Sequence, residues 1–448
     1  MRASLPLLAT LLLGCAVSRS AGHGPVAQLV QQRTGQRTHW EQGSLEVAQV
    51  AELVEKLLQQ GLTRERAIEI ALVNNRALQA TYEDLDISQA EVVQAGLLKN
   101  PSLSLGVGLG ASLLELEGSL VQDFLDLLVL PLRKKIAKER FTVAVLRVAH
   151  QAYQVTVEVS KHFAAVQAAQ QVVEYRRTVA AAAQALAELS ARQHEAGNIN
   201  DLVLAAEKAA YEVAELERER AESAVVDARE RLNRTLGLWG PQTGWTIAQP
   251  LPEPPAAEPG LEHLETLALR QRLDVDAARK EVALLTRAAA LARDFRLLGR
   301  VEVGLQGHRD PDGPRVLGPS LTLDLPIFDQ RQAEIARLDA SRRQAERRLA
   351  ALAVDARSEV RAARLQLLAL RRMIDRYRTA LLPLREQITA LSQLQYNGML
   401  LGPAQLLAAK QAQVDTYQQY VEALRDYWSL RAELERAVGG RLSQGPRT

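Results

Sequence analysis

The feature that most constrains this chain is a strand pattern that passes directly into a very long helical seam. From Gly318 to Asp329 leucines alternate with polar residues, which is the period of a strand with one apolar face, until Pro326 ends it. A helix from Gln330 to Gln395 would then be on the order of 100 Å long at ~1.5 Å per residue. Its apolar residues follow one another at steps of three and four, as in a coiled coil. They are Leu349, Leu352, Ala356, Val360, Ala363, Leu367, Leu370, Ile374, Tyr377, Leu381, Leu384, Ile388 and Leu391.

The same order of elements occurs earlier in the chain. After the helix-breaking pair Asn100-Pro101, apolar residues alternate with Ser and Gly from Leu103 to Leu109, and a second strand is expected from Leu114 to about Phe124. A long helix is then expected from Ile136 to Glu195. Helix, hairpin, long helix, turn and helix therefore occur twice, offset by roughly 200 residues, and this duplication defines the architecture.

The duplication also gives the domain plan. The expected segments are a lipoprotein signal peptide (1–15), a tether (16–44), repeat 1 (45–236), a proline-rich linker (237–260), repeat 2 (261–440) and a tail (441–448). In each repeat we expect one continuous helix before the hairpin, a hairpin (about 102–124 and 300–325), and a tip turn between the long helix and its return helix (196–202 and 397–407). Pro383 interrupts the second long helix and predicts a kink. We hypothesise that it marks the level at which the proline-rich linker packs around the helices.

Composition agrees with long helices and excludes several classes of function. Of the 448 residues, 47% are hydrophobic but only 4% are aromatic, which favours long helices over compact α/β domains. The net charge of +2 gives no electrostatic reason to expect nucleic acid. The seven His, three Met and single Cys show no metal-ligand spacing, and no nucleophile–base set or glycine-rich phosphate loop stands out. We therefore expect neither an enzyme nor a cofactor or metal site.

The position of the only cysteine, Cys15, is informative. It follows Met1-Arg2 and an apolar run from Leu5 to Leu13, and a charged start with a short apolar core describes a secretory signal. Leu12-Leu13-Gly14-Cys15 resembles a bacterial lipobox, in which the thiol receives a diacylglycerol and the cysteine becomes the mature N-terminus. We expect lipidation of Cys15, with fatty acids such as palmitate; the alternative is an ordinary signal peptide that contains a Cys. Ala16, in place of Asp, favours the outer membrane by resemblance to other bacterial lipoproteins.

The strands predict assembly with other copies of the chain. Each alternating segment has an apolar face and a small, polar face, which is the pattern of a membrane barrel strand. Two strands per repeat give four per chain, which cannot close a barrel, and open strand edges are not tolerated in lipid. A trimer would pool twelve strands, an even number within the range of such barrels. The same trimer would pool the long helices into a tube, each seam buried against a neighbour.

The chain resembles the TolC-like outer membrane efflux proteins over residues 45 to 440. The resemblance rests on the duplicated order, the two glycine turns, and the motifs Gly318-Pro319-Ser320 to Phe328-Asp329, Asn100-Pro101 and Leu130-Pro131-Leu132-Arg133. It implies a mostly helical, trimeric channel-tunnel with a twelve-stranded β-barrel in the outer membrane and an α-helical barrel in the periplasm. The lipobox and the first hairpin resemble the lipoprotein members of the heavy-metal branch, of the CusC and CzcC type, which serve resistance-nodulation-division pumps.

The resemblance also implies partners and site residues. The homotrimer would passively conduct small solutes, such as drugs or metal ions, from a periplasmic adaptor (membrane fusion) protein and an inner membrane efflux transporter to the exterior. The adaptor would dock at the tip turns, where the implied residues are Gly197, Asn198, Asp201, Asn397 and Gly398. Some members carry aspartates at the aperture just after the second tip, but residues 403–408 hold no carboxylate here, which leaves Asp201 as the nearby candidate. Asp324, on the polar face of its strand, is expected to face the lumen.

Two other functions are compatible with the residues. An outer membrane duct for type I protein secretion keeps the fold, although the lipobox and the short first hairpin argue mildly against it. A periplasmic coiled-coil scaffold lipoprotein would have no pore, and the alternating segments at 102–109, 301–305 and 320–325 oppose it, because a scaffold needs no two-faced strands. Gly197 and Gly398 could equally serve only to end helices.

Overall fold

The computed structural model describes residues 21–41, 43–109, 114–247, 249–256, 262–309 and 315–442, and its contacts divide the chain into two compact units. Unit 1 is formed by Met1–Val26, Thr81–Ala149 and Leu273–Ala353, and unit 2 by Ala27–Ala80, His150–Arg272 and Val354–Thr448. Both sequence repeats contribute to each unit, so the units do not coincide with the repeats. The hairpins of the two repeats lie together in unit 1, and their tip turns lie together in unit 2.

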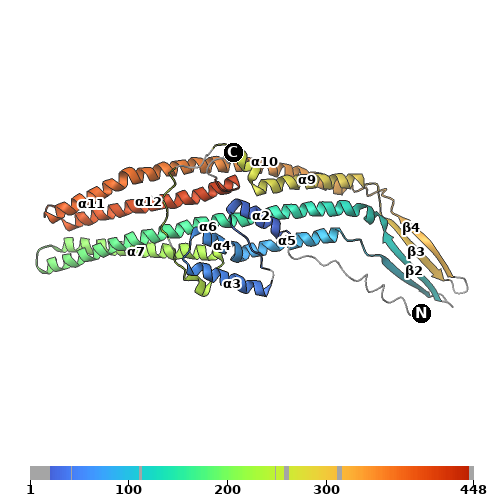
Figure 1. The fold of residues 1–448 in the computed structure, drawn as a ribbon, viewed down its shortest axis with the longest axis horizontal. Helices are drawn as coiled ribbons and strands as arrows, with labels where there is room; N and C mark the ends of the chain where they lie inside the picture. Colours follow the sequence, from blue (N-terminus) through green and yellow to red (C-terminus); the bar gives the residue numbers. More distant parts are fainter. Residues whose placement is uncertain are drawn as a thin grey trace. The chain divides into compact units, whose positions relative to one another are not determined.

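Unit 1 contains an antiparallel four-stranded sheet (Figure 1). Its strands are β1 (Ser102–Leu109), β2 (Leu114–Asp123), β3 (Val301–Arg309) and β4 (Arg315–Leu323), and they neighbour one another in that order. Each predicted hairpin pairs within itself, and β2 of repeat 1 pairs with β3 of repeat 2. The two repeats are therefore joined through one continuous sheet.

The register places most of the apolar residues of the four strands on one face. Leu103 lies opposite Leu120, which lies opposite Leu305, and Val303 lies opposite Leu321. Directly opposed residues of an antiparallel pair share a face. These five side chains are 46% to 67% exposed, so the described residues leave much of the apolar face that they form uncovered. The other face carries mostly small and polar residues, with Val121 and Val316 as exceptions, which confirms the two-faced strands predicted from the alternation.

The two repeats leave the sheet differently. In repeat 1, helix α6 (Phe124–Glu195) begins directly after β2, because the carboxylate of Asp123 accepts a hydrogen bond from the backbone N–H three residues on and caps the first turn. The prediction of a helix starting only at Ile136 was wrong, since this cap starts the helix earlier and Pro131 lies inside it. In repeat 2, Pro326 follows β4, and α10 (Gln332–Arg376) begins only after a non-helical connection.

The other helical elements follow the duplicated order, and α7 and α12 have the same length of 36 residues. The segment expected to be a tether contains helix α2, whose Val26 and Val30 are fully buried, so its polar composition was misleading. None of the described helices combines the length and hydropathy needed to span a membrane. The elements are α2 (His23–Thr34), α3 (Ser44–Gln59), α4 (Arg64–Asn74), α5 (Arg76–Ala95), α7 (Asp201–Leu236), η2 (Gly240–Thr243), α8 (Leu264–Gln271), α9 (Leu273–Asp294), η3 (Tyr377–Leu381), α11 (Leu382–Asn397) and α12 (Pro403–Val438).

Each repeat has a helix break at the point where its return helix ends. The helix predicted before each hairpin is in fact broken, at Asn75 in repeat 1 and at Arg272 in repeat 2. Gly237 ends α7 with φ +72°, and a Cβ there would lie 2.4 Å from the carbonyl oxygen of Asn74. Gly439 ends α12 with φ +88°, and a Cβ there would lie 2.8 Å from the backbone nitrogen of Arg272. Each break therefore packs against the glycine that ends the return helix of its own repeat.

The described end of the proline-rich linker, residues 249–256, forms a strap across three helices of unit 2. Gln167 of α6 donates hydrogen bonds to two strap carbonyls at 2.8 and 3.0 Å. The Trp428 indole of α12 and the Arg371 guanidinium of α10 each donate to a further strap carbonyl at 2.7 Å. The Tyr420 hydroxyl binds the strap residue Glu253, and the Tyr420 ring lies 6.2 Å from that of Tyr377. This geometry supports the hypothesis that the linker packs near Pro383.

Pro383 does not break the long helix of repeat 2; instead a π-helical turn, η3, lies just before it. A π turn carries one extra residue, so the side chains beyond it are rotated by about 100° relative to a regular helix. Before the turn, seam residues such as Val360, Leu367 and Ile374 are at most 1% exposed. Beyond it, Leu384 and Ile388, which belong to the same predicted seam, are exposed. The predicted seam is therefore one pattern in the sequence but two differently oriented faces in the structure.

Candidate functional site

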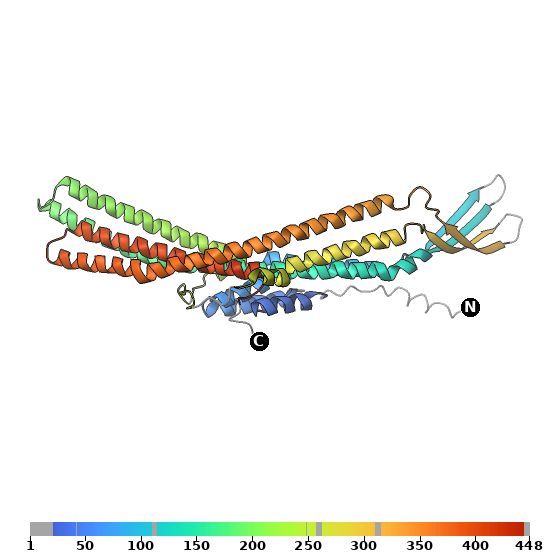
Figure 2. The same ribbon diagram turned by 90° about the horizontal axis from the view of Figure 1, so that it is seen from above.

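Unit 2 contains two helical hairpins, α6–α7 and α11–α12, which lie side by side with their turns at the same end (Figures 1 and 2). The first turn comprises residues 196–200 and the second turn residues 398–402. Both lie where the duplicated sequence predicts tip turns. The five residues that the sequence suggested for docking all lie in these turns or at the helix ends next to them.

The first turn ends α6 with a left-handed residue. Gly197 has φ +73°, and its N–H donates to the carbonyl oxygen of His194 at 2.8 Å. The N–H of Asn198 donates to the carbonyl oxygen of Gln193 at 2.8 Å, and this pair of bonds is a Schellman motif. A Cβ at Gly197 would meet nothing within 4 Å, so glycine is favoured there by backbone conformation alone.

A side-chain contact then links the two helices across the first turn. Asn200 caps α7 by accepting a hydrogen bond from the N–H of Val203 at 3.0 Å. Asp201, the first residue of α7, lies 2.7 Å from Nε2 of His194 near the end of α6. The Asp201 side chain is 97% exposed, so its carboxylate is presented at the surface. Sequence reasoning missed His194, although its spacing of one heptad from Asp201 could have indicated the pair.

The second turn has the same motif, but its left-handed residue is Met399. The N–H of Met399 (φ +60°) donates to the carbonyl oxygen of Tyr396, and that of Leu400 to the carbonyl oxygen of Gln395, both at 2.9 Å. Gly398, which the sequence suggested, has φ −83° and needs no special conformational freedom. A non-glycine residue in the left-handed region costs about 1–2 kcal/mol, so the second turn is strained where the first is not.

The two turns present different surfaces. Met399 and Leu400 are 94% and 82% exposed, and Leu394 at the end of α11 is also exposed, so the second turn is apolar. Asn397, the last residue of α11, accepts a hydrogen bond from the amide of Gln393 at 3.0 Å and lies beside this apolar group. The first turn presents amide and carboxylate groups, with exposed Leu202 beside them at the start of α7.

The other two suggested residues are Asp324 and Cys15. Asp324 lies one residue beyond the end of β4, so its assignment to the strand itself was wrong by one position. Its N–H donates to the carbonyl oxygen of Arg300 at 2.9 Å, and its carboxylate lies 3.5 Å from the guanidinium of the same residue. Cys15 lies outside the described residues.

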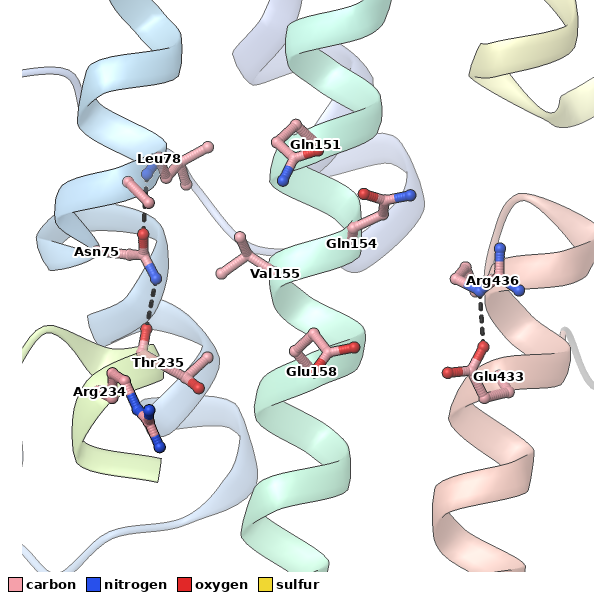
Figure 3. Close-up of a pocket in the computed structure, with 11 residues that line it drawn as sticks. Asn75, Leu78, Gln151, Gln154, Val155, Glu158, Arg234, Thr235, Glu433 and Arg436 are labelled. Atoms are coloured by element: carbon pink, nitrogen blue, oxygen red, sulfur yellow. Dashed lines mark hydrogen bonds and ion pairs between the residues drawn. The ribbon is translucent and has the colours of Figure 1, made fainter. Parts of the chain in front are cut away.

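A groove of about 500 Å³ in unit 2 is lined by α5, α6, α7 and α12 (Figure 3). On one wall the Asn75 side chain accepts from the N–H of Leu78 at 2.8 Å and donates to the carbonyl oxygen of Thr235 at 2.7 Å. On the other wall Arg436 donates to Glu433 at 2.6 Å. Because these polar groups bind one another, the groove has the character of a gap between packed helices and not of a ligand site.

Glu433 belongs to an ion-pair network that ties three helices of unit 2 together. Its carboxylate lies 2.7 Å from Nζ of Lys161 on α6 and also binds Arg436. Arg436 reaches Glu359 of α10 at 3.3 Å, and the buried Arg272 reaches the same carboxylate at 2.7 Å. Burial alone would raise the pKa of Glu433, but the hydrogen bonds from Lys161 and Arg436 outweigh it and lower that pKa. The carboxylate is therefore held in its charged form.

No protein-family model matches the chain, and no curated protein matches its sequence. Within the described residues, no group of three or more His, Cys, Asp or Glu side chains could hold a metal ion. Solved structures, by contrast, match the fold.

The CmeC outer membrane channel of Campylobacter jejuni matches with a TM-score of 0.72 and 14% identity, covering 94% of this chain and 93% of CmeC. A membrane protein from Pseudomonas aeruginosa matches with a TM-score of 0.70 and 18% identity, covering 89% of this chain and 92% of its own. CusC, which forms a transmembrane channel as it folds, matches with a TM-score of 0.67 and 16% identity, covering 87% of this chain and 92% of CusC. These matches confirm the TolC-like fold that the resemblance predicted.

Proposed function

We propose that this protein is the outer membrane exit duct of a tripartite efflux system and passively conducts small solutes, such as drugs or metal ions, to the exterior. The observation that carries the proposal is the match of nearly the whole chain, 94% of it, to a solved outer membrane channel. Because the match leaves out only a small part of the chain, it extends into both repeats. On this proposal the chain is a conduit, and it contributes no chemical step.

The sheet supports assembly into a trimeric, twelve-stranded barrel. The described residues of one chain supply a four-stranded sheet, and the apolar face that its strands share is exposed in the single chain. In a closed barrel this face would contact lipid, and the small, polar face would line the lumen. Asp324, at the end of β4, would then lie at the rim of the lumen. The long helices of the three copies would continue the duct into the periplasm.

The turns support docking of a periplasmic adaptor that connects the duct to an inner membrane transporter. The second turn offers an exposed apolar group, Met399 and Leu400, and the first offers the exposed carboxylate of Asp201. Apolar anchors beside polar groups are the usual composition of a protein interface. Gly197, Asn198, Asn397 and Gly398 would contribute backbone and amide groups. Lipidation of Cys15 would add a second attachment to the outer membrane.

Single-channel conductance of the detergent-extracted protein in a planar bilayer tests the proposal, with the oligomer mass measured on the same sample. We expect a trimer with small, gated conductance. Asp201→Ala, which removes the contact with His194 across the first turn, should raise the open fraction. Asp227→Ala is the matched control, because it removes an exposed carboxylate from the same helix that pairs only along the helix, with Arg231. A monomer, or a trimer that never conducts in any turn variant, would instead favour the scaffold function.

A further inference from the structure

The exposed face at the start of α6, in unit 1, changes from apolar to basic along the helix. The Phe and Leu side chains on this face are 40% to 56% exposed, and three exposed lysines follow them. Buried Asp126 and Ala137 lie on the opposite side of the helix. We define the α6 entry face as the exposed residues between 124 and 138 that share an arc of about 160°: Phe124, Leu127, Leu128, Pro131, Leu132, Lys134, Lys135 and Lys138.

The three lysines of the α6 entry face make no ion pair within the described residues. The carboxylates nearby are bound by other cations, because Asp123 lies 3.1 Å from Nζ of Lys99 and Asp126 lies 2.8 Å from the guanidinium of Arg133. Four of the nine lysines in this arginine-rich chain fall between residues 99 and 138. The start of α6 therefore carries a local excess of positive charge.

The end of α5 adds apolar surface beside the α6 entry face. Arg133 of α6 donates hydrogen bonds to the carbonyl oxygens of Ala95 and Leu97 at 3.1 and 2.9 Å, so this segment is held against the first turns of α6. Leu97 and Leu98 are both exposed there. Repeat 2 also has two exposed leucines, at 297 and 298, just before its hairpin. Exposed apolar residues thus gather where the helices meet the sheet.

The apolar part of the α6 entry face continues the apolar face of the sheet. Phe124 follows Leu116 and Leu120 at steps of four, so it falls on the same alternation of β2. Strand β2 leads directly into α6 (Figure 1). On the proposed function the apolar face of the sheet contacts lipid, and the start of α6 would then lie at the edge of the hydrocarbon layer.

The lysines follow at the distance at which lipid headgroups are expected. Lys135 and Lys138 lie about 10 and 15 Å beyond Leu128 along the helix. The headgroup layer extends about 5–7 Å beyond the hydrocarbon. Side chains of a helix tilt toward its N-terminus, which here is the end joined to the sheet. Lysine stems can lie along apolar surface while the ammonium group reaches the headgroups.

We propose that the α6 entry face binds anionic phospholipids in the leaflet nearest the helices, with Lys134, Lys135 and Lys138 contacting their phosphate groups. Charge complementarity favours a lipid with a net negative charge over a zwitterionic lipid, whose own ammonium group offsets its phosphate. The inference rests on the proposed function for the position of the bilayer, but the selectivity comes from the three lysines.

Native mass spectrometry of the full-length protein in a non-ionic detergent tests the inference. Phosphatidylglycerol and phosphatidylethanolamine with the same acyl chains are supplied in equal amounts, and the parent protein should retain phosphatidylglycerol in preference. Raising ammonium acetate from about 0.1 M to about 1 M should weaken the preference, because the Debye length falls from about 10 Å to about 3 Å. Inorganic phosphate at the lipid concentration should not displace the bound lipid.

Substitution of the lysines should remove the preference. Lys134→Gln/Lys135→Gln/Lys138→Gln should lower the ratio of the two retained lipids at least tenfold, since each cation beside an anionic lipid surface contributes about fivefold. The three Lys→Arg changes keep the charge and should keep the preference. The matched control changes the net charge equally at three other exposed lysines and should leave the ratio unchanged: Lys56→Gln/Lys208→Gln/Lys280→Gln.

The apolar half of the α6 entry face has its own test. Leu127→Ser/Leu128→Ser changes two exposed side chains and should lower retention of both lipids without changing their ratio. Unchanged retention would show that this half does not contact lipid, and would overturn the proposed position of the face.

The outcomes separate this inference from the proposed function. A conducting trimer that retains both lipids equally, or that loses its preference as much in the control triple variant, overturns the inference and leaves the duct intact. Displacement of the lipid by inorganic phosphate overturns the assignment to a lipid. A protein that selects phosphatidylglycerol through these three lysines but never conducts overturns the duct alone.

Discussion

Replacing Gly237 with alanine tests how far stability depends on the close approach at the end of α7. An alanine at φ +72° costs about 1–2 kcal/mol through its backbone conformation. The new Cβ would also lie 2.4 Å from the carbonyl oxygen of Asn74, so the two segments must move apart. The Asn74 amide donates to the carbonyls of Leu236 and Gly237 at 2.9 and 3.0 Å, and losing both bonds costs about 1 kcal/mol each. The expected destabilisation is therefore about 3–4 kcal/mol.

Gly197→Ala is the matched control, because this glycine has nearly the same φ, +73°, and a Cβ there would meet no atom within 4 Å. It should cost only the conformational part, about 1–2 kcal/mol. Asparagine tolerates the left-handed region, so Gly197→Asn should be close to neutral, whereas Gly237→Asn should remain destabilising.

Thermal unfolding of the purified protein, followed by far-UV circular dichroism, measures the difference. Since the entropy of unfolding is about 2.1 cal/mol/K per residue, 1 kcal/mol shifts Tm by roughly 1 °C for a chain of 448 residues, and Gly237→Ala should melt about 2 °C below Gly197→Ala. Equal Tm values for the two alanine variants would refute the reasoning, because they would show that the contact with Asn74 relaxes without cost.

Three further outcomes are expected. Met399→Gly should raise stability by about 1 kcal/mol by relieving the left-handed strain, whereas Gly398→Ala should change Tm little; the reverse order would contradict the assignment of the turn. Glu433→Gln should lower the free energy of unfolding at neutral pH. The pKa of Glu433 in the folded state is below its ordinary value of 4.5, so the charged carboxylate stabilises the fold above pH 4.5. This stabilisation is lost as the pH falls through the folded-state pKa. The Tm values of the parent and the variant should therefore converge in acid. A difference in Tm that does not change with pH would argue against the ion pairs. The double variant Trp428→Phe/Arg371→Ala removes two donors to the strap and should speed proteolysis within residues 249–256; an unchanged cleavage rate would show that the strap is held by other contacts.

The periodic parts of the fold could be predicted from the sequence. The alternation at Leu103 to Leu109 indicated a two-faced strand, and the steps of three and four along α10 indicated a packed helix, because both patterns reflect burial of whole faces. The turns were placed correctly for the same reason, as interruptions in a duplicated pattern. Recognition of the duplication turned two weak hairpin signals into one architecture.

The missed features depend on contacts between segments that are distant in the sequence. The approach of Gly237 to Asn74 and of Gly439 to Arg272 is one such contact, although the break at Asn75 also has a local signal, because the Asn75 side chain caps α5 by accepting from the N–H of Leu78. The sequence suggested Gly398 as a residue that ends the helix, because glycine is the usual choice, yet the left-handed residue of the second turn is Met399. The π turn was also missed, since an extra residue in a helix leaves the pattern of steps almost unchanged.

The equal length of the two return helices has a consequence for how sequences of this fold can diverge. Helices α7 and α12 both span 36 residues between a left-handed turn and a glycine cap. A single-residue insertion in one of them would displace its turn by ~1.5 Å and rotate it by about 100° relative to the other. We therefore expect length changes to be inherited as matched pairs, or as whole heptads that nearly restore the rotation. Spacing, more than residue identity, would then be the conserved quantity, in keeping with a shared fold at 14% to 18% identity.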